Sequence, residues 1–172
     1  MSETILVEHF TNEQEWSLKS VDLSLHRYWI KPDGALYTSP VASIFGWRHW
    51  TRDEVFGLGS YRIELEVEVN RCYQIDSVRD MHRLPWRKHP QTNVLEYVDY
   101  QHMLRQGVQC VWLTVDGQWA TRSLWPRNLN GWDCETIAIL DTACILDWRL
   151  DRAYQRTGIS QVAQTEPRLA PA

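Results

Sequence analysis

The sequence predicts an α+β fold in which a mixed or antiparallel β-sheet is split into two halves and short helices are inserted between strand pairs. Segments with strand character outnumber helical segments, the helical segments are short, and the two kinds do not alternate regularly. The 172 residues suffice for one domain with a sizeable core. We expect residues 1–154 to form this domain. Residues 155–172 lack hydrophobic periodicity and are expected to be a disordered tail.

The overall charge and the hydropathy pattern argue against several classes of protein. The formal charge is −4, which gives no general attraction to nucleic acids or to anionic membranes. No run of about eighteen apolar residues occurs, so we expect no membrane span. The first ten residues, MSETILVEHF, lack the basic region and apolar stretch of a signal peptide. These patterns predict a cytoplasmic protein.

The cysteines of the chain indicate buried core positions, whereas the tryptophans indicate a groove or an interface as well. The four cysteines form no C-x-x-C pair, and Cys110, Cys134 and Cys144 lie in apolar segments, so we expect buried free thiols. No ligand spacing indicates a metal site, and no metal is predicted. The ten tryptophans are too many for one small core. Some of them are therefore expected to line a groove or an interface.

The first forty residues contain an expected edge strand over 5–11, a loop or short helical turn over 11–20, and a hairpin over 21–39. The hairpin has a Pro-Asp-Gly turn, and Pro40 ends its second strand. Both strands carry polar side chains where a core hairpin would be apolar. These side chains belong to His26, Arg27, Tyr37, Thr38 and Ser39. We interpret this hairpin as one wall of a ligand cleft.

The next segment predicts a helix over 41–56, with Ile44, Trp47 and Val55 on one face. The clearest strand follows over 61–69, where apolar residues alternate with Arg and Glu, so one face is expected to pack and the other to meet water. A turn at Asn70-Arg71 leads to a strand over 72–76.

Caps and turn residues delimit the remaining elements. Pro85 ends a helix over 77–84, while Asp99 and Gly107 flank a helix over 100–106. A strand over 108–115 is expected to end in an Asp116-Gly117 turn. A loop and two strands are expected over 118–131, 132–140 and 143–148.

Residues 79–89 form a basic, aromatic-bearing cluster in this acidic chain. Its principal members are Arg79, Arg83, Trp86, Arg87 and Lys88. Two interpretations stay open, a solvated surface loop or a contact for phosphate or nucleic acid.

Several motifs of known enzymes do not occur in the chain, namely the P-loop, G-x-G-x-x-G, G-x-S-x-G and H-E-x-x-H. Three polar groups remain on or beside expected strands: His26 with Arg27, residues 37–39, and Asp133 with Glu135. Together they could bind a dinucleotide. The cation would hold a phosphate, the hydroxyls would position a ribose, and the acid would stabilise an oxocarbenium ion.

The segments that carry these groups resemble the ADP-ribosyltransferase fold, a split sheet that cleaves NAD at the nicotinamide–ribose bond. The matching segments are LHRYW at 25–29, LYTSP at 36–40 and WDCE at 132–135, and residues 61–76 look like a strand pair of that fold. KPDGALYTSP and GWDCE are also similar to a K-P-x-G-x-L/W-x-S-P segment and a late W-D segment of small phage-encoded proteins. The chain departs from the family in carrying Tyr-Thr-Ser rather than Ser-Thr-Ser.

The resemblance implies a role for each residue, with NAD as the donor substrate. Arg27 or His26 would hold the NAD phosphates, and Ser39 with Tyr37 and Thr38 would organise the nicotinamide ribose. Trp47 or Trp50 would flank the cleft, and Glu135 or Asp133 would stabilise the oxocarbenium-like state. The acceptor would be a protein or a nucleic acid, docked on the cluster at 79–89.

Other interpretations of these residues stay open. Ser39 could serve only to cap the following helix, and Asp133 could make a local turn hydrogen bond. As an alternative function, the chain could be a non-catalytic phage-type inhibitor that binds a host complex through a tryptophan-rich acidic surface.

Overall fold

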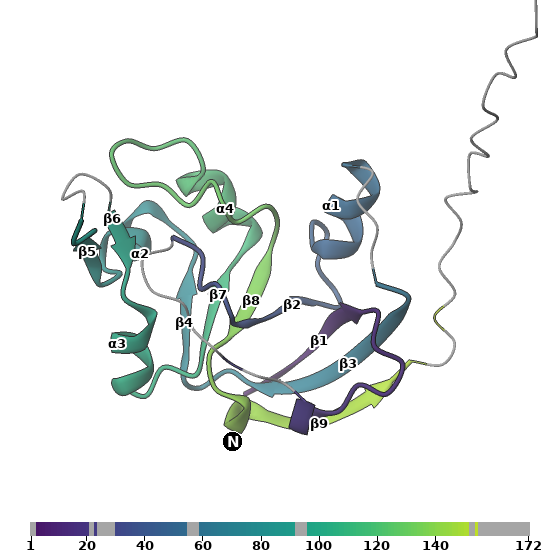
Figure 1. Ribbon diagram of the computed structural model, residues 1–172. Coiled ribbons are helices and arrows are strands. Elements are labelled where there is room, and N and C mark those ends of the chain that lie inside the picture. The colour runs from purple at the N-terminus through teal and green to yellow at the C-terminus, as the bar shows by residue number, and fades with distance from the viewer. Residues whose placement is uncertain are drawn as a thin grey trace, which may run out of the picture.

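The computed structural model describes residues 3–20, 23, 30–54, 59–91, 96–151 and 154. Within them the protein is α+β, with a curled mixed sheet of seven strands, a two-stranded ribbon and a few short helices (Figure 1). The strands of the large sheet are β1 (Thr4–Thr11), β2 (Leu36–Pro40), β3 (Tyr61–Glu68), β4 (Cys72–Ile75), β7 (Cys110–Leu113), β8 (Thr136–Ile139) and β9 (Ile145–Leu150). The first strand of the expected hairpin and the expected tail lie almost entirely outside the described residues.

The strand order of the large sheet is β4-β7-β8-β2-β1-β3-β9. The β4–β7 pair is parallel and the other pairs are antiparallel. β2 joins the two parts of the sheet, because its residues 36–38 pair with β8 while only Ser39 and Pro40 pair with β1. A single short strand therefore connects a β4-β7-β8 part to a β1-β3-β9 part.

The prediction that residues 5–11 form an edge strand is wrong. β1 lies between β2 and β3 and pairs with β3 along its whole length, from Thr4 opposite Glu68 to Thr11 opposite Tyr61. The strand predicted at 61–69 is confirmed as β3, and Ile63 and Leu65 on its apolar face are fully buried. Its other face is not simply solvated, because Glu64 is buried there against Arg62.

β3 and β4 do not form the strand pair expected over 61–76. β4 lies at the far edge of the sheet and pairs with β7, whereas β3 pairs with β1 and β9. The connection turns at its start, where the amide of Val69 donates to the carbonyl of Glu3 at 2.9 Å and that of Cys72 donates to Val69 at 3.0 Å. The chain thus crosses from one part of the sheet to the other.

Two of the short helices are confirmed where they were expected. α2 (Val78–His82) follows Ser77, and α3 (Tyr100–Arg105) is capped by Asp99, whose side chain accepts from the His102 amide at 2.8 Å. Gly107 ends α3 with φ of +85°, a conformation that favours glycine. α1 (Trp47–Asp53) is shorter than the expected helix.

The turn expected at Asp116-Gly117 is wrong, and so are the first four residues of the loop expected over 118–131. Both lie in a helix, α4 (Val115–Thr121). The Thr114 hydroxyl begins the helix by accepting from the Gly117 amide at 3.1 Å. Gly117 faces the sheet so closely that an added Cβ would lie 1.9 Å from the carbonyl oxygen of Ile75. This glycine permits close packing rather than a turn.

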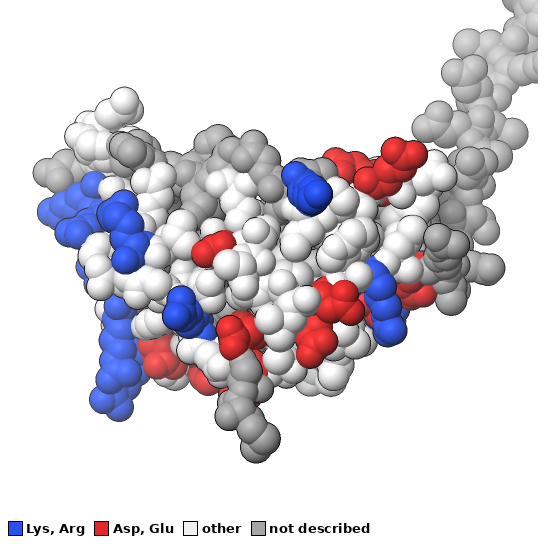
Figure 2. All heavy atoms as spheres, turned by 90° about the horizontal axis from the view of Figure 1, so that it is seen from below, with Lys and Arg blue, Asp and Glu red and all other residues white. Residues whose placement is uncertain are grey.

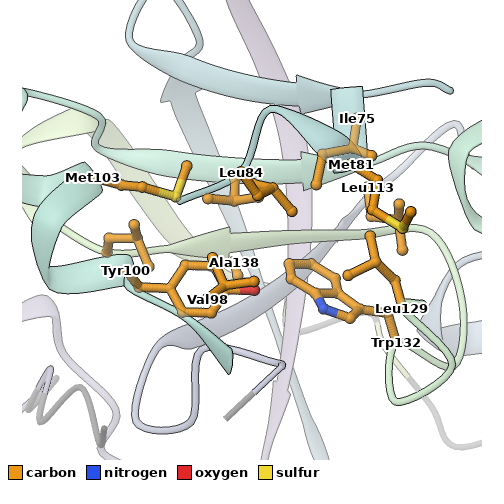
Figure 3. Close-up of a cluster of buried hydrophobic side chains, with 12 residues drawn as sticks. Ile75, Met81, Leu84, Val98, Tyr100, Met103, Leu113, Leu129, Trp132 and Ala138 are labelled. Carbon is orange, nitrogen blue, oxygen red and sulfur yellow. The ribbon is translucent and has the colours of Figure 1, made fainter. Parts of the chain in front are cut away.

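The hydrophobic core lies in two clusters. One packs α2 and α3 against the β4-β7-β8 part of the sheet, and Figure 3 shows its side chains, among them Ile75, Met81 and Trp132. The other lies against β1 and β3 around Val7 and Leu65. The remaining elements are β5 (Trp86–Lys88), β6 (Glu96–Val98) and the 3₁₀ turns at Leu18–Ser20 and Thr142–Cys144.

The cysteines agree with the sequence prediction. Cys110, Cys134 and Cys144 are buried free thiols, and Cys72 is a half-buried one. None of the helices formed by the described residues has the length and apolarity needed to cross a membrane.

Candidate functional site

Three side chains, one of them from about a hundred residues further along the chain, lie around the ammonium group of Lys31. Its Nζ lies 3.3 Å from Oδ2 of Asp133, 4.8 Å from the centre of the Tyr37 ring and 4.6 Å from that of Trp47. Lys31 and Asp133 are partly exposed, with 22% and 35% of their side chains accessible. We call Lys31, Tyr37, Trp47 and Asp133 the Lys31 cluster. It combines a cation, a carboxylate and two aromatic rings at a solvent-accessible position.

The Pro-Asp-Gly turn brings Lys31 back over β2. The amide of Asp33 donates to the carbonyl of Lys31 at 2.7 Å, that of Ala35 donates to Pro32 at 2.9 Å, and Gly34 adopts φ of +85°. The Tyr37 hydroxyl donates to the Pro32 carbonyl at 2.8 Å and so fixes the turn to the strand. Burial, together with the nearby Asp33, raises the pKa of Tyr37, so the phenol stays neutral at physiological pH.

The hydroxyls of Thr38 and Ser39 are fully buried and hydrogen-bonded to backbone groups. Thr38 Oγ1 donates to the carbonyl of Ile137 at 2.8 Å, and Ser39 Oγ donates to that of Glu135 at 2.7 Å. Ser39 Oγ also accepts from the Trp47 amide at 2.9 Å and thereby holds the start of α1. As these bonds stand, both residues position the walls of the site rather than present a hydroxyl to a ligand.

Ser39 also explains why the expected helix over 41–56 begins late. An added Cβ on Gly46 would lie 2.8 Å from Cβ of Ser39, so the chain passes close to β2 before Trp47 starts the helix. Ile44 precedes the helix and is 79% exposed, so its expected place on a buried face is wrong. Trp47 is fixed at the first turn, where its ring reaches Lys31.

Replacing Ser39 by Ala is expected to lower the free energy of unfolding by about 1–3 kcal/mol, because the Trp47 amide and the Glu135 carbonyl each lose a buried partner. Urea denaturation followed by tryptophan fluorescence measures the change. Ser60→Ala is the matched control, because Ser60 is exposed and its hydroxyl makes a 3.3 Å contact with Asn12. Equal stability of the two variants would contradict the positioning role of Ser39.

The segment that carries both candidate acids is held from two sides. Nε2 of Gln118, on α4, donates to the carbonyl of Asp133 at 3.1 Å, and the amide of Glu135 donates to the carbonyl of Phe45 at 2.9 Å. Both α4 and α1 rise from the same side of the sheet (Figure 1). Asp133 faces Lys31, whereas Glu135 is only 7% exposed and its Oε1 accepts from Nε1 of Trp112 at 2.9 Å.

Two polar atoms, one in the Lys31 cluster and one on a residue that contacts the Asp133 backbone, are buried without a hydrogen-bond partner among the described residues. They are Nε1 of Trp47, a donor, and Oε1 of Gln118, an acceptor. Buried polar atoms are normally paired, and an unpaired one costs free energy. An acceptor atom of a ligand would satisfy the first of these atoms and a donor atom would satisfy the second. Nδ1 of His49 is a third such atom.

The remaining sequence candidates stand as follows. His26 and Arg27 lie outside the described residues. Trp50 packs edge-on against Trp47, with ring centres 5.5 Å apart. Cys134 lies next to Asp133, and burial raises the pKa of its thiol to about 12, so it is protonated at neutral pH and is not an activated nucleophile.

Sequence reasoning missed Lys31, Gln118 and His9. Lys31 is the first residue of the KPDG turn, but the role of the cation was assigned to His26 or Arg27, a few residues earlier. His9 on β1 donates from Nδ1 to the carbonyl of Tyr37 at 2.9 Å, and burial lowers its pKa. Nothing in the local sequence connects His9 or Gln118 with residues 37 or 133, because these contacts depend on strand order.

Comparison of the chain with models of protein families, with curated proteins and with solved structures found no match. Within the described ranges, no group of three His, Cys, Asp or Glu side chains is placed to hold a metal ion. Function is therefore inferred from the geometry of the Lys31 cluster.

Proposed function

We propose that the protein binds NAD at the Lys31 cluster and transfers ADP-ribose from it to an acceptor, in the manner of ADP-ribosyltransferases. The observation that carries this proposal is the convergence of Lys31, Tyr37, Trp47 and Asp133 beside the strand that joins the two parts of the sheet. A dinucleotide needs a cation for its phosphates, a flat surface for a ring and an acid near its ribose. The cluster supplies all three.

Lys31 and Asp133 exchange partners when the substrate binds. A phosphate of NAD takes the Lys31 ammonium, which frees the Asp133 carboxylate from its ion pair. The carboxylate then faces the ribose and stabilises the positive charge that develops there. Trp47 offers its ring to a base and its unpaired Nε1 to an acceptor oxygen. His26 or Arg27 provides a second cation for the phosphates.

The reaction breaks the bond between the nicotinamide nitrogen and C1 of the ribose. Nicotinamide leaves as a neutral molecule with the bonding electrons, and the ribose becomes oxocarbenium-like. A nucleophilic atom of the acceptor attacks C1 and loses its proton. Without an acceptor, water takes this place and the products are ADP-ribose and nicotinamide. Glu135, fixed by Trp112, positions the segment that carries Asp133.

The test is to incubate the protein with NAD labelled in its adenylate part, and to measure nicotinamide release and label transfer to protein or nucleic acid. We expect nicotinamide release and quenching of tryptophan fluorescence by NAD, because Trp47 lies in the site. Absence of both turnover and quenching at millimolar NAD would overturn the proposal. Quenching without turnover would reduce it to NAD binding.

A non-catalytic inhibitor is the second candidate, and one surface favours it. Trp119 is 62% exposed, its ring stacks on Phe45 with centres 6.1 Å apart, and Ile44, which precedes Phe45, is 79% exposed. Such exposed aromatic groups are typical of binding hot spots. An inhibitor would keep its complex after Arg27→Ala and Glu135→Ala and lose it after Trp119→Ala. An enzyme would show the reverse pattern in NAD turnover.

A further inference from the structure

A basic surface lies at the end of the molecule that carries α2 and the β5–β6 ribbon. Figure 2 shows Lys and Arg gathered along the left edge of the face it presents. We call Arg79, Arg83, Arg87 and Lys88 the basic edge. All four are exposed, and among the described residues the single carboxylate within ion-pair distance of them is Asp99, 3.8 Å from Nε of Arg87. Glu96 lies opposite Lys88 in the ribbon, but its ion pair is with Arg127. This end is cationic although the chain has a net charge of −4.

The acid within this stretch does not cancel the basic edge. Asp80 turns its carboxylate toward the start of α2, where it accepts from the Ser77 hydroxyl at 2.6 Å and from the Asp76 amide at 3.3 Å. The Ser77 hydrogen bond lowers the pKa of Asp80. The hydrogen bonds of the carboxylate thus go to donors at its own helix terminus, and Arg83 is the one cation of the basic edge whose charge also lowers the pKa of Asp80.

Trp86 supports this surface but is not its stacking platform. Its Nε1 donates to the carbonyl of Met81 at 2.8 Å, and the guanidinium of Arg127 lies 5.4 Å from its ring centre. Arg127 is fixed in turn by two hydrogen bonds to Glu96 on β6. One side of the Trp86 ring is therefore covered, and the loop that follows α4 is anchored to the ribbon.

That anchored loop carries Trp125, the most exposed large apolar side chain among the described residues, at 91%. It lies two residues before Arg127 and one after Leu124, whose carbonyl accepts from Asn128 at 3.2 Å. The loop is thus held on both sides of Trp125 while the indole faces solvent. The ring thus stands on a loop that Arg127 ties to the ribbon carrying Arg87 and Lys88. An exposed, flat ring combined with clustered cations is what unpaired bases stack on.

We infer that this end of the molecule binds single-stranded nucleic acid, with phosphates on the basic edge and a base stacked on Trp125. The clustered cations favour a polyanion as the partner. The exposed ring favours a polyanion whose bases have free faces, as in a single strand, over a duplex or an acidic protein. The surface goes beyond the proposed NAD site and shares no residue with it. Binding is measured without NAD, so the two proposals succeed or fail separately.

The first experiment measures fluorescence anisotropy of a labelled oligothymidylate of about 20 nucleotides against salt concentration. Four phosphate contacts predict a slope of about −3 for log K against log salt, and Arg87→Ala with Lys88→Ala should halve it. Lys19→Ala with Arg52→Ala is the control, since it removes two exposed cations elsewhere and should leave the slope unchanged.

The second experiment tests the stacking ring. Trp125→Ala should weaken binding about fivefold or more, while Trp125→Phe keeps most of the affinity. Neither variant should change the thermal midpoint, because the side chain is exposed. Equal binding of Trp125→Ala and wild type, or equal affinity for single-stranded and duplex DNA, would overturn the inference. Competition by polyglutamate as effective as by the oligonucleotide would also overturn it.

Discussion

Asp133→Asn is expected to lower the rate of nicotinamide release from NAD by about a hundredfold or more, the usual effect of removing one group that stabilises charge in a transition state. Asn keeps the size of the side chain but not its negative charge. The ion pair with Lys31 is lost, so the ammonium stays available to a phosphate. We therefore expect kcat to fall while the affinity for NAD stays within about tenfold of wild type.

Two further carboxylate variants sharpen this prediction. Glu135→Gln retains an oxygen that accepts from the Trp112 indole, so its rate should fall less than that of Asp133→Asn. Asp147→Asn, at an exposed position of β9, should leave the rate unchanged. The opposite order for Glu135 and Asp133 would assign the acid to Glu135. Full activity in both variants would place the chemistry outside this segment.

Arg62→Met is expected to lower the free energy of unfolding by about 3 kcal/mol, since it breaks buried ion pairs and leaves carboxylates uncompensated. Arg62 is 13% exposed and touches three acids: its Nε lies 2.8 Å from Glu8, its Nη2 2.8 Å from Glu64 and its Nη1 2.7 Å from Asp151. The network ties β1, β3 and the end of β9 together on the face where the sequence predicted solvent.

Urea denaturation of the wild type and of Arg62→Met measures this difference in the free energy of unfolding. Arg52→Met is the control, because Arg52 is 71% exposed and pairs with Asp53 at the surface, so its loss should change stability by less than about 1 kcal/mol. A change below about 1 kcal/mol for Arg62→Met as well would show that Arg48 and Arg149, which contact Glu8 and Glu64, compensate these acids without it.

The sequence alone determined the elements whose signals are local. β3 follows from strict alternation over eight residues, and α3 from Asp99 at its start and Gly107 after its end. The turn after Lys31 follows from Pro-Asp-Gly. Each of these features depends on residues a few positions apart, so the chain specifies them without reference to the rest of the fold.

The tertiary structure decided everything that depends on distant partners. It made β1 a central strand, separated β4 from β3, and turned the Asp116-Gly117 segment into a helix packed on Ile75. In the candidate site it fixed the Ser39 hydroxyl between Glu135 and Trp47, and it set Lys31 against Asp133, about a hundred residues later. Hydrogen bonds and ion pairs act over a few ångströms in space. Their partners are therefore set by strand order, which the local pattern of residues does not encode.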